Sequence, residues 1–193
     1  MANHHRAVAA RMARVLAPQA WCLDVGCGGG ELPLALARLR RDCSVVGIDP
    51  SASAIARGRR RARGIAAVRL LRAGAERLPL PSAWAHGATA IGVIKHGVDA
   101  RQALTEVRRV VRPGGWLWIY EPDPAAAGVQ ERFSGLVTDS RAVAARIPQR
   151  SVLPHSVARE QLREQCLAAV WTIDEDRAMP DLPLYAFHLR KPA

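Results

Sequence analysis

The stretch "LDVGCGGGEL", residues 23–32, joins a short apolar run to a helix-like sequence through a turn made mostly of glycine. A turn of this composition between a strand and a helix lets the backbone approach a bound group closely. The bound group can be a pyrophosphate, a triphosphate or a ligand without phosphate, and the spacing of the glycines discriminates among them.

Neither phosphate-binding pattern fits this turn. A dinucleotide-binding turn has its third glycine at the sixth position, where this chain has Glu31, and the spacing that does occur is Gly26, Gly28 and Gly30. A P-loop would continue with Gly-Lys-Ser or Gly-Lys-Thr, which is absent here. Asp24 and Glu31 flank the place that a pyrophosphate would need, and like charges at close range oppose binding. We expect a cationic ligand, and the alternative is a tight turn without any ligand.

A second acid ends the next apolar run. In "CSVVGIDPS", residues 43–51, Asp49 takes this position, and a doubly wound sheet brings the ends of adjacent strands together. An acid there can accept hydrogen bonds from both hydroxyls of a ribose. The alternative for Asp49 is the N-cap of the helix that begins near Ser51.

Apolar runs and helical stretches alternate along the first two thirds of the chain. Five strand-like runs are complete by residue 121, and Pro180 and Pro183 bracket the connection between the last two runs. This pattern predicts an α/β fold with a Rossmann-like, doubly wound, mostly parallel seven-stranded sheet, an antiparallel C-terminal hairpin and helices on both faces. With 193 residues the chain suits one domain.

The composition narrows the class of protein. Hydrophobic residues make up 49% and charged residues 23%, and no apolar run is long enough to span a bilayer. The N-terminus "MANHHRAVAARMARVLAP" favours an amphipathic helix of a cytoplasmic protein, with His4 and His5 exposed to solvent. The four cysteines lack metal-ligand spacing, so we expect buried thiols and no metal site.

The formal net charge of +11 favours an anionic partner such as RNA. Only two of the 28 basic residues are lysines, Lys95 and Lys191, and such a bias also arises from a GC-rich coding sequence. An RNA partner is therefore disfavoured, although it stays open.

The glycine turn and its acid resemble the motif acid-x-Gly-x-Gly-x-Gly of class I S-adenosylmethionine-dependent methyltransferases. Three later stretches resemble the small-molecule, ubiquinone/menaquinone methyltransferase-like subset in the same order: "AGAERLPLP" (residues 73–81), "GVIKHGVDARQAL" (92–104) and "RVVRPGGWLWIYEP" (109–122). In the last of these, Gly114 is expected to stop a helix. The resemblance covers about residues 20–122.

The resemblance implies S-adenosyl-L-methionine as cofactor and S-adenosyl-L-homocysteine as product. It implies that Asp24 attracts the amino group of the cofactor, commonly through water, and that the glycines pass close to its methionine part. The implied cofactor-binding residues are Asp24, Gly26, Cys27, Gly28, Gly30, Asp49, Pro50, Ser51, Gly74, Ala75, Glu76 and Ile91. We therefore divide the domain, residues 1–193, into an N-terminal helix (1–18), a cofactor-binding core (20–122), a variable cap (123–155) and a C-terminal helix with a hairpin (156–193).

Two departures from the family pattern stand out. Gly74 replaces the acid that accepts a hydrogen bond from the adenine amino group, which leaves backbone groups near Ala75 and apolar stacking for the adenine. The fourth strand, "GATAIGVI" (residues 87–94), is glycine-rich and weak for a central strand. Either neighbouring packing compensates, or the chain is a degenerate, methyltransferase-like interaction module.

Methyl transfer depends mainly on aligning the acceptor, so a general base is optional. The resemblance makes His96 the first candidate for that base, ahead of Lys95 and Glu121, and a packing role for His96 is an equal alternative. The Asn/Asp-Pro-Pro-aromatic motif of amino-methylating enzymes is absent after the fourth strand. We expect a small-molecule acceptor that is methylated on oxygen, nitrogen or carbon, with an RNA-directed methyltransferase as the remaining alternative. The pattern leaves the oligomeric state open.

Overall fold

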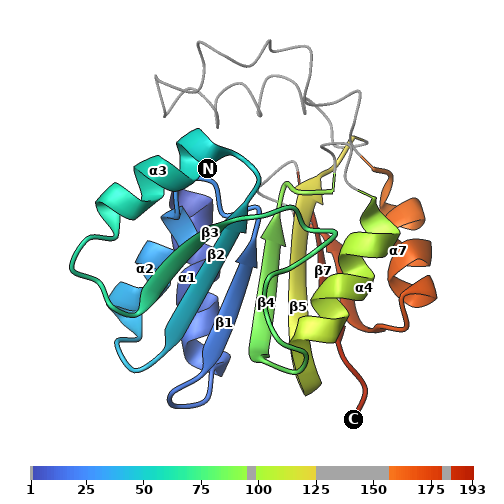
Figure 1. Ribbon diagram of the computed structural model, residues 1–193. Helices are drawn as coiled ribbons and strands as arrows, with labels where there is room; N and C mark the ends of the chain where they lie inside the picture. The colour runs from blue at the N-terminus through green and yellow to red at the C-terminus, as the bar shows by residue number, and fades with distance from the viewer. Residues whose placement is uncertain (1, 95–98, 125–156, 180–183) are drawn as a thin grey trace.

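The computed structural model describes residues 2–94, 99–124, 157–179 and 184–193 (Figure 1). In chain order its elements are α1 (Ala2–Val15), β1 (Trp21–Val25), α2 (Glu31–Leu39), β2 (Ser44–Asp49), α3 (Ala52–Arg61), β3 (Val68–Arg72), β4 (Ala85–Ile91), α4 (Ala100–Val110), β5 (Val111–Pro122), α7 (Arg159–Ala168), β6 (Thr172–Ala178) and β7 (Leu184–Arg190).

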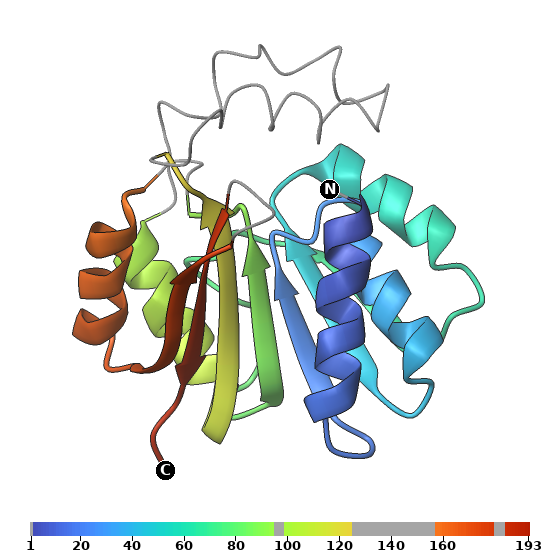
Figure 2. The same ribbon diagram turned by 180° about the vertical axis from the view of Figure 1, so that it is seen from behind.

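The strands form one seven-stranded sheet in the order β3-β2-β1-β4-β5-β7-β6. The first five strands pair in parallel, and β7 runs antiparallel to both β5 and β6. Helices cover both faces, with α1, α2 and α3 on one and α4 and α7 on the other (Figures 1 and 2). The predicted fold class is therefore confirmed, including the antiparallel C-terminal hairpin. Pro180 and Pro183 lie outside the described residues.

The strand order reverses between β1 and β4, which both pair with neighbours in parallel. In sheets of this kind the crevice at the carboxyl ends of the strands, at such a reversal, is the usual place for a ligand. The loops that follow β1, β2, β3 and β4 meet at this edge. The fold thus brings the glycine turn and the acid after β2 to the same place.

The central strand β4 is shorter than expected and is supported by packing. It spans Ala85–Ile91 instead of residues 87–94, and the following residues leave the sheet. Gly87 pairs with Trp116 on β5, and a methyl group placed on Gly87 would lie only 2.3 Å from the indole ring. Gly87 therefore leaves space for the indole of Trp116, which covers β4 at the position where β4 has no side chain. Neighbouring packing is the compensation that the weak sequence requires.

Gly114 does not stop a helix, although its φ of 70° is in the left-handed region. Helix α4 ends at Val110, four residues earlier. Lys191 closes this end by donating from Nζ to the carbonyl oxygens of Arg108 and Val111, at 2.8 and 2.7 Å. Gly114 instead lies in the stretch where the register between β4 and β5 is irregular, between the Ala85 and Gly87 pairings.

Within the described ranges, no helix is both long and apolar enough to cross a membrane. All four cysteines are buried thiols, as expected.

Candidate cofactor site

The glycine turn lies at the carboxyl end of β1 and leads into α2. Gly26, Gly28 and Gly30 have φ values of 68°, 52° and 80°. A methyl group on Gly26 would lie 2.4 Å from Val93 Cγ2, whereas one on Gly28 would meet no atom within 4 Å. Because Gly26 has no side chain, Val93 of the loop after β4 can pack directly against it. Gly28 leaves open space above the turn for a ligand.

Asp24 is the buried acid of the site, with 3% of its surface exposed. It pairs in register with Thr89 on β4, whose Oγ1 donates a hydrogen bond of 2.8 Å to Asp24 Oδ1. Burial raises the pKa of Asp24 to about 7, the hydrogen bond from Thr89 opposes this rise, and the charges of Asp49 and Glu31 add to it. A carboxyl group in this state gains much from a nearby cation, because the cation offsets its lost hydration.

Asp49 connects the glycine turn to the start of α3. Its Oδ2 accepts from the backbone N–H of Gly28 at 2.9 Å, and its Oδ1 accepts from that of Ser51 at 2.8 Å. The N-cap of α3 is Ser51, whose Oγ accepts from Ala54 N at 3.3 Å. Asp49 therefore holds two backbone groups and is not the cap itself. Each carboxylate oxygen keeps a second lone pair for another donor.

Glu31 is not free to face a ligand as the sequence suggested. Its carboxylate forms an ion pair with Arg61 on α3, and Arg61 also donates to the carbonyl oxygen of Gly29 at 3.0 Å. The acids left to face a ligand at this edge are therefore Asp24 and Asp49.

The side chain of Cys27 belongs to the apolar core. It packs beside Ile55 and Leu70, and a methyl group on Gly47 would lie 2.8 Å from its sulfur atom. Burial raises the pKa of this thiol well above its ordinary value. Only the backbone of Cys27 is placed to meet a ligand, and it already bonds to Ile48 O and Gly30 N.

Glu121 anchors the loop after β4, although the sequence placed it among the candidate bases. The side chain is only 1% exposed, and its Oε1 accepts from the backbone N–H groups of Val93 and Ile94 at 2.7 and 2.9 Å. Glu121 therefore fixes the segment that contacts Gly26.

Ile91, the last residue of β4, packs with the apolar residues of α1. Sequence reasoning missed Thr89 and Val93, since their roles depend on which strands are neighbours. The register of β4 beside Asp24 is the signal that identifies Thr89.

The loop after β3 carries Gly74, Ala75 and Glu76 and lies beside Asp49. The backbone N–H of Ala73 donates to Asp49 O at 3.3 Å. The buried side chain of Ala75 packs against the core under the sheet edge. This loop therefore forms the wall of the site next to the end of β2.

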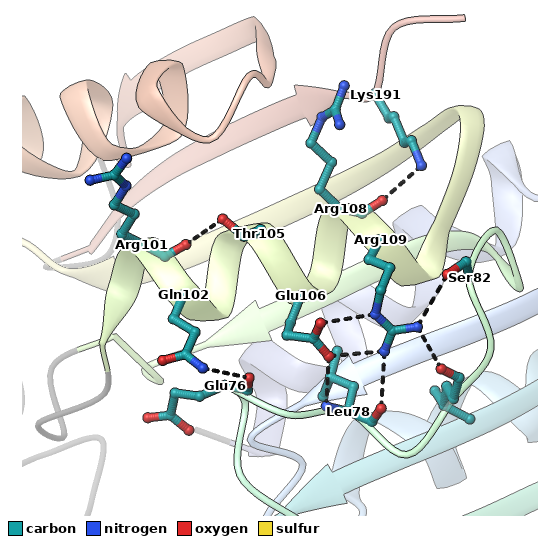
Figure 3. Close-up of polar contacts among 11 residues, drawn as sticks. Glu76, Leu78, Ser82, Arg101, Gln102, Thr105, Glu106, Arg108, Arg109 and Lys191 are labelled. Carbon is teal, nitrogen blue, oxygen red and sulfur yellow. Dashed lines mark hydrogen bonds and ion pairs between the residues drawn. The ribbon is translucent and has the colours of Figure 1, made fainter.

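Helix α4 holds this loop through a polar network (Figure 3). Arg109 donates to both carboxylate oxygens of Glu106 at 2.9 Å and to the carbonyl oxygens of Leu78 and Leu80 at 3.1 and 2.9 Å. Glu106 in turn accepts from Leu78 N at 3.0 Å. The Arg109 guanidinium lowers the pKa of Glu106, so the carboxylate is charged at neutral pH.

Two of the histidines that the sequence analysis singled out have different outcomes. His96, like Lys95, lies outside the described residues. His4 was expected to be exposed, but it is 6% exposed and its ring packs edge-on against Tyr120 at 5.1 Å. Burial lowers the pKa of His4 to about 4, so the ring is neutral at physiological pH.

Among the described side chains, no group of three or more potential ligands could hold a metal ion.

The fold and this edge define a class of protein: a Rossmann-like domain whose glycine turn and two acids suit a nucleoside ligand with a cationic end. Comparison with known families specifies the class further. Residues 23–119, half of the chain, match the family model described as a methyltransferase domain, and the chain belongs to this family. The resemblance noted in the sequence is thereby confirmed.

Relatives of known name are similar to a little over half of the chain. A demethylmenaquinone methyltransferase of Thermus thermophilus is 38% identical over 108 residues, which cover 55% of this chain and 49% of that protein. An O-methyltransferase of Pyrenophora dematioidea is 38% identical over 114 residues, which cover 54% of this chain and 42% of that protein. The chain thus spans about half the length of these relatives or less.

Solved structures agree on the fold. The [4+2]-cyclase SpnF has a TM-score of 0.77 at 22% identity, over 97% of this chain and 81% of that chain. A SAM-dependent methyltransferase of Methanosarcina mazei has a TM-score of 0.71 at 18% identity, over 94% of this chain and 97% of that chain. At these identities the likeness is one of fold alone.

Proposed function

We propose that this chain transfers a methyl group from S-adenosylmethionine to an oxygen, nitrogen or carbon atom of a small-molecule acceptor. One observation carries the proposal: buried Asp24, held by Thr89, lies next to an open glycine turn with Asp49 at the neighbouring strand end. The methyltransferase domain match and the relatives named as quinone and O-methyltransferases support it.

The residues present fit this cofactor. The space above Gly28 allows a ligand to approach the backbone, and a desolvated carboxyl at Asp24 suits an ammonium group. Asp49 has acceptor capacity left for ribose hydroxyls, and Pro50 is exposed beside it. We propose that Asp24 holds the amino group and Asp49 the ribose, with Gly26, Gly28, Gly30, Pro50 and Ser51 lining the floor.

When bound, the cofactor supplies a methyl group on a sulfonium, which is already an activated electrophile. The contribution of the chain is alignment and exclusion of water, which together account for much of the rate in such displacements. The anchored segment Gly92–Ile94, with Val93 against Gly26, forms an apolar wall at the strand ends. His96, three residues beyond Val93, is our proposal for the group that removes a proton from an acceptor that carries one.

Calorimetric titration with S-adenosylmethionine and S-adenosylhomocysteine tests the cofactor, and release of S-adenosylhomocysteine with a panel of quinols, catechols and amines tests transfer. We expect one site per chain with dissociation constants well below about 1 mM, equivalent to more than about 4 kcal/mol of binding free energy. Absence of binding up to that concentration contradicts the proposal. Binding without turnover on any acceptor supports the degenerate interaction module.

A further inference from the structure

The space beside Gly74 is taken by the carboxylate of Glu76. A methyl group placed on Gly74 would lie 2.8 Å from Glu76 Oε2, and apart from Gly74 and its two chain neighbours no other heavy atom of the described residues lies within 4 Å of that point. The side chain of Glu76 thus folds back along the loop and brings an acidic oxygen to the position that a side chain at residue 74 would occupy.

This oxygen lies at the edge of the proposed cofactor site. The residue before Gly74 donates its backbone N–H to Asp49 O, so the loop after β3 is directly adjacent to the acid proposed to hold the ribose. A base attached to that ribose extends from Asp49 either along this loop or toward the loop after β4. The loop after β3 offers its backbone and the Glu76 carboxylate for hydrogen bonds, while the side chain of Ala75 packs into the core beneath.

The carboxylate of Glu76 is available for a ligand. Its backbone carbonyl oxygen accepts from Gln102 Nε2 at 3.3 Å, and this is the only contact drawn for the residue in Figure 3. Among the described residues, no group donates to either carboxylate oxygen. The backbone of Glu76 is held by α4, and within the described part of the chain its carboxylate keeps its acceptor capacity for a ligand.

We propose that Glu76 accepts a hydrogen bond from the exocyclic amino group of adenine, in place of the side chain missing at residue 74, and that it sets the preference for a 6-aminopurine. The assignment rests on the proposed function. A carboxylate facing the base attracts an N–H donor and repels a 6-oxo group, so the contact discriminates between adenine and hypoxanthine.

Calorimetric titration with S-adenosylhomocysteine and its 6-oxo analogue, S-inosylhomocysteine, tests the assignment without any acceptor. The wild-type protein should bind the amino compound at least about tenfold more tightly. In Glu76→Gln the amide can donate to the 6-oxo group, so the ratio should fall to about one or reverse. Glu164→Gln, the same chemical change at an exposed position of α7, should leave the ratio unchanged.

A second variant moves the acid back to residue 74. Gly74→Asp alone should weaken binding, because the new carboxylate crowds and repels that of Glu76. Gly74→Asp combined with Glu76→Ala should restore the ratio, whereas Glu76→Ala alone should lose it.

An unchanged ratio in Glu76→Gln, or no recovery in the double variant, overturns the assignment while the cofactor proposal stands. If the wild-type protein binds neither compound, the proposed function fails and this inference with it. Equal melting temperatures of the variants exclude misfolding as the cause of any loss.

Discussion

At the residue scale, the burial of Asp24 has two opposite effects, one on stability and one on ligand binding. Its burial next to Thr89 makes the charged form costly in the free protein, and the same burial makes that charge effective toward a cation. The carboxyl side chain is thus a stability cost that the proposed function explains. Thr89 moderates the cost through a hydrogen bond that a serine could also make but a valine could not.

We predict that Asp24→Asn weakens binding of S-adenosylhomocysteine by about 1.5 to 3 kcal/mol, because it removes a charged partner of the ammonium group. Calorimetry at pH 8 measures the loss. Asp174→Asn, at an exposed position of β6, is the matched control and should bind as the wild type does. Equal affinity of both variants would place the amino group elsewhere.

The same substitution should change the pH dependence of stability. The pKa of Asp24 is raised in the folded protein to about 7, so the folded state binds more protons than the unfolded state between about pH 4 and pH 7. The stability of the wild type should therefore fall as the pH rises through this range. Asp24→Asn should be more stable than the wild type at pH 8, by about 4 kcal/mol, and similar to it near pH 4. Urea unfolding measures the free energy of unfolding of both proteins at pH 4 and pH 8. The same difference between the proteins at both pH values would contradict the ionisation of a buried Asp24.

At the scale of elements, the site depends on contacts between segments far apart in the sequence. The loop after β3 is held by α4, the loop after β4 by Glu121 of β5, and the turn after β1 by Asp49 of β2. Each anchor is a polar side chain that forms hydrogen bonds with backbone groups of a neighbouring segment. The backbone that lines the proposed site is thus held in place by side chains from neighbouring elements, and one of them, Asp49, is also proposed to contact the ligand.

We predict that Arg109→Met loosens the loop that carries Gly74 and Glu76. Since it removes the bonds to Leu78 and Leu80 and the partner of Glu106, it should cost roughly 1 to 3 kcal/mol of stability. It should also lower the affinity for S-adenosylhomocysteine several-fold, although Arg109 lies outside the site. Arg101→Met, on the same helix with its guanidinium directed away from the loop in Figure 3, should change neither quantity. A loss of stability without a loss of affinity would show that the network stabilises the fold but does not position the site.

We predict that Gly87→Ala destabilises the protein even though alanine favours a strand more than glycine does. The added methyl group would lie 2.3 Å from the Trp116 ring, and overpacking of this kind costs about 1 to 3 kcal/mol. Trp116→Leu should relieve the clash, so the double variant should be more stable than the two single effects would give if they added. Thermal unfolding of the four proteins measures this coupling, and strict additivity would contradict it.

At the scale of the whole molecule, the sequence predicted the fold class because hydrophobic periodicity and turn chemistry are local signals. It predicted the region of the site for the same reason, since Gly26, Gly28 and Gly30 and the acids Asp24 and Asp49 end strands that the topology must bring together. It did not predict the burial of His4 or the pairing of Glu31 with Arg61. Those depend on how α1 packs against the sheet and how α2 and α3 lie beside each other, which no local pattern encodes.

The net charge of +11 leads to a prediction about nucleic acids. Arg57, Arg60 and Arg63 are exposed near the end of α3, and none has a partner among the described residues. We expect weak, sequence-independent binding of a short RNA at low salt that falls steeply as salt rises, because phosphate contacts release counterions. Fluorescence anisotropy over a salt series measures the slope. Tight binding that persists at about 0.2 M salt would favour the RNA-directed alternative over a small-molecule acceptor.

The contact between Gly87 and Trp116 also bears on how relatives of this chain should be compared. The indole of one strand fills the volume that the neighbouring strand leaves empty, so we expect the sizes of the two side chains to compensate each other among relatives. An alignment that scores each column separately would record drift at both positions in a lineage where nothing about the packing has changed. Covariation of residues 87 and 116, small with large, is therefore a better marker of an intact central strand in this family than the identity of either residue.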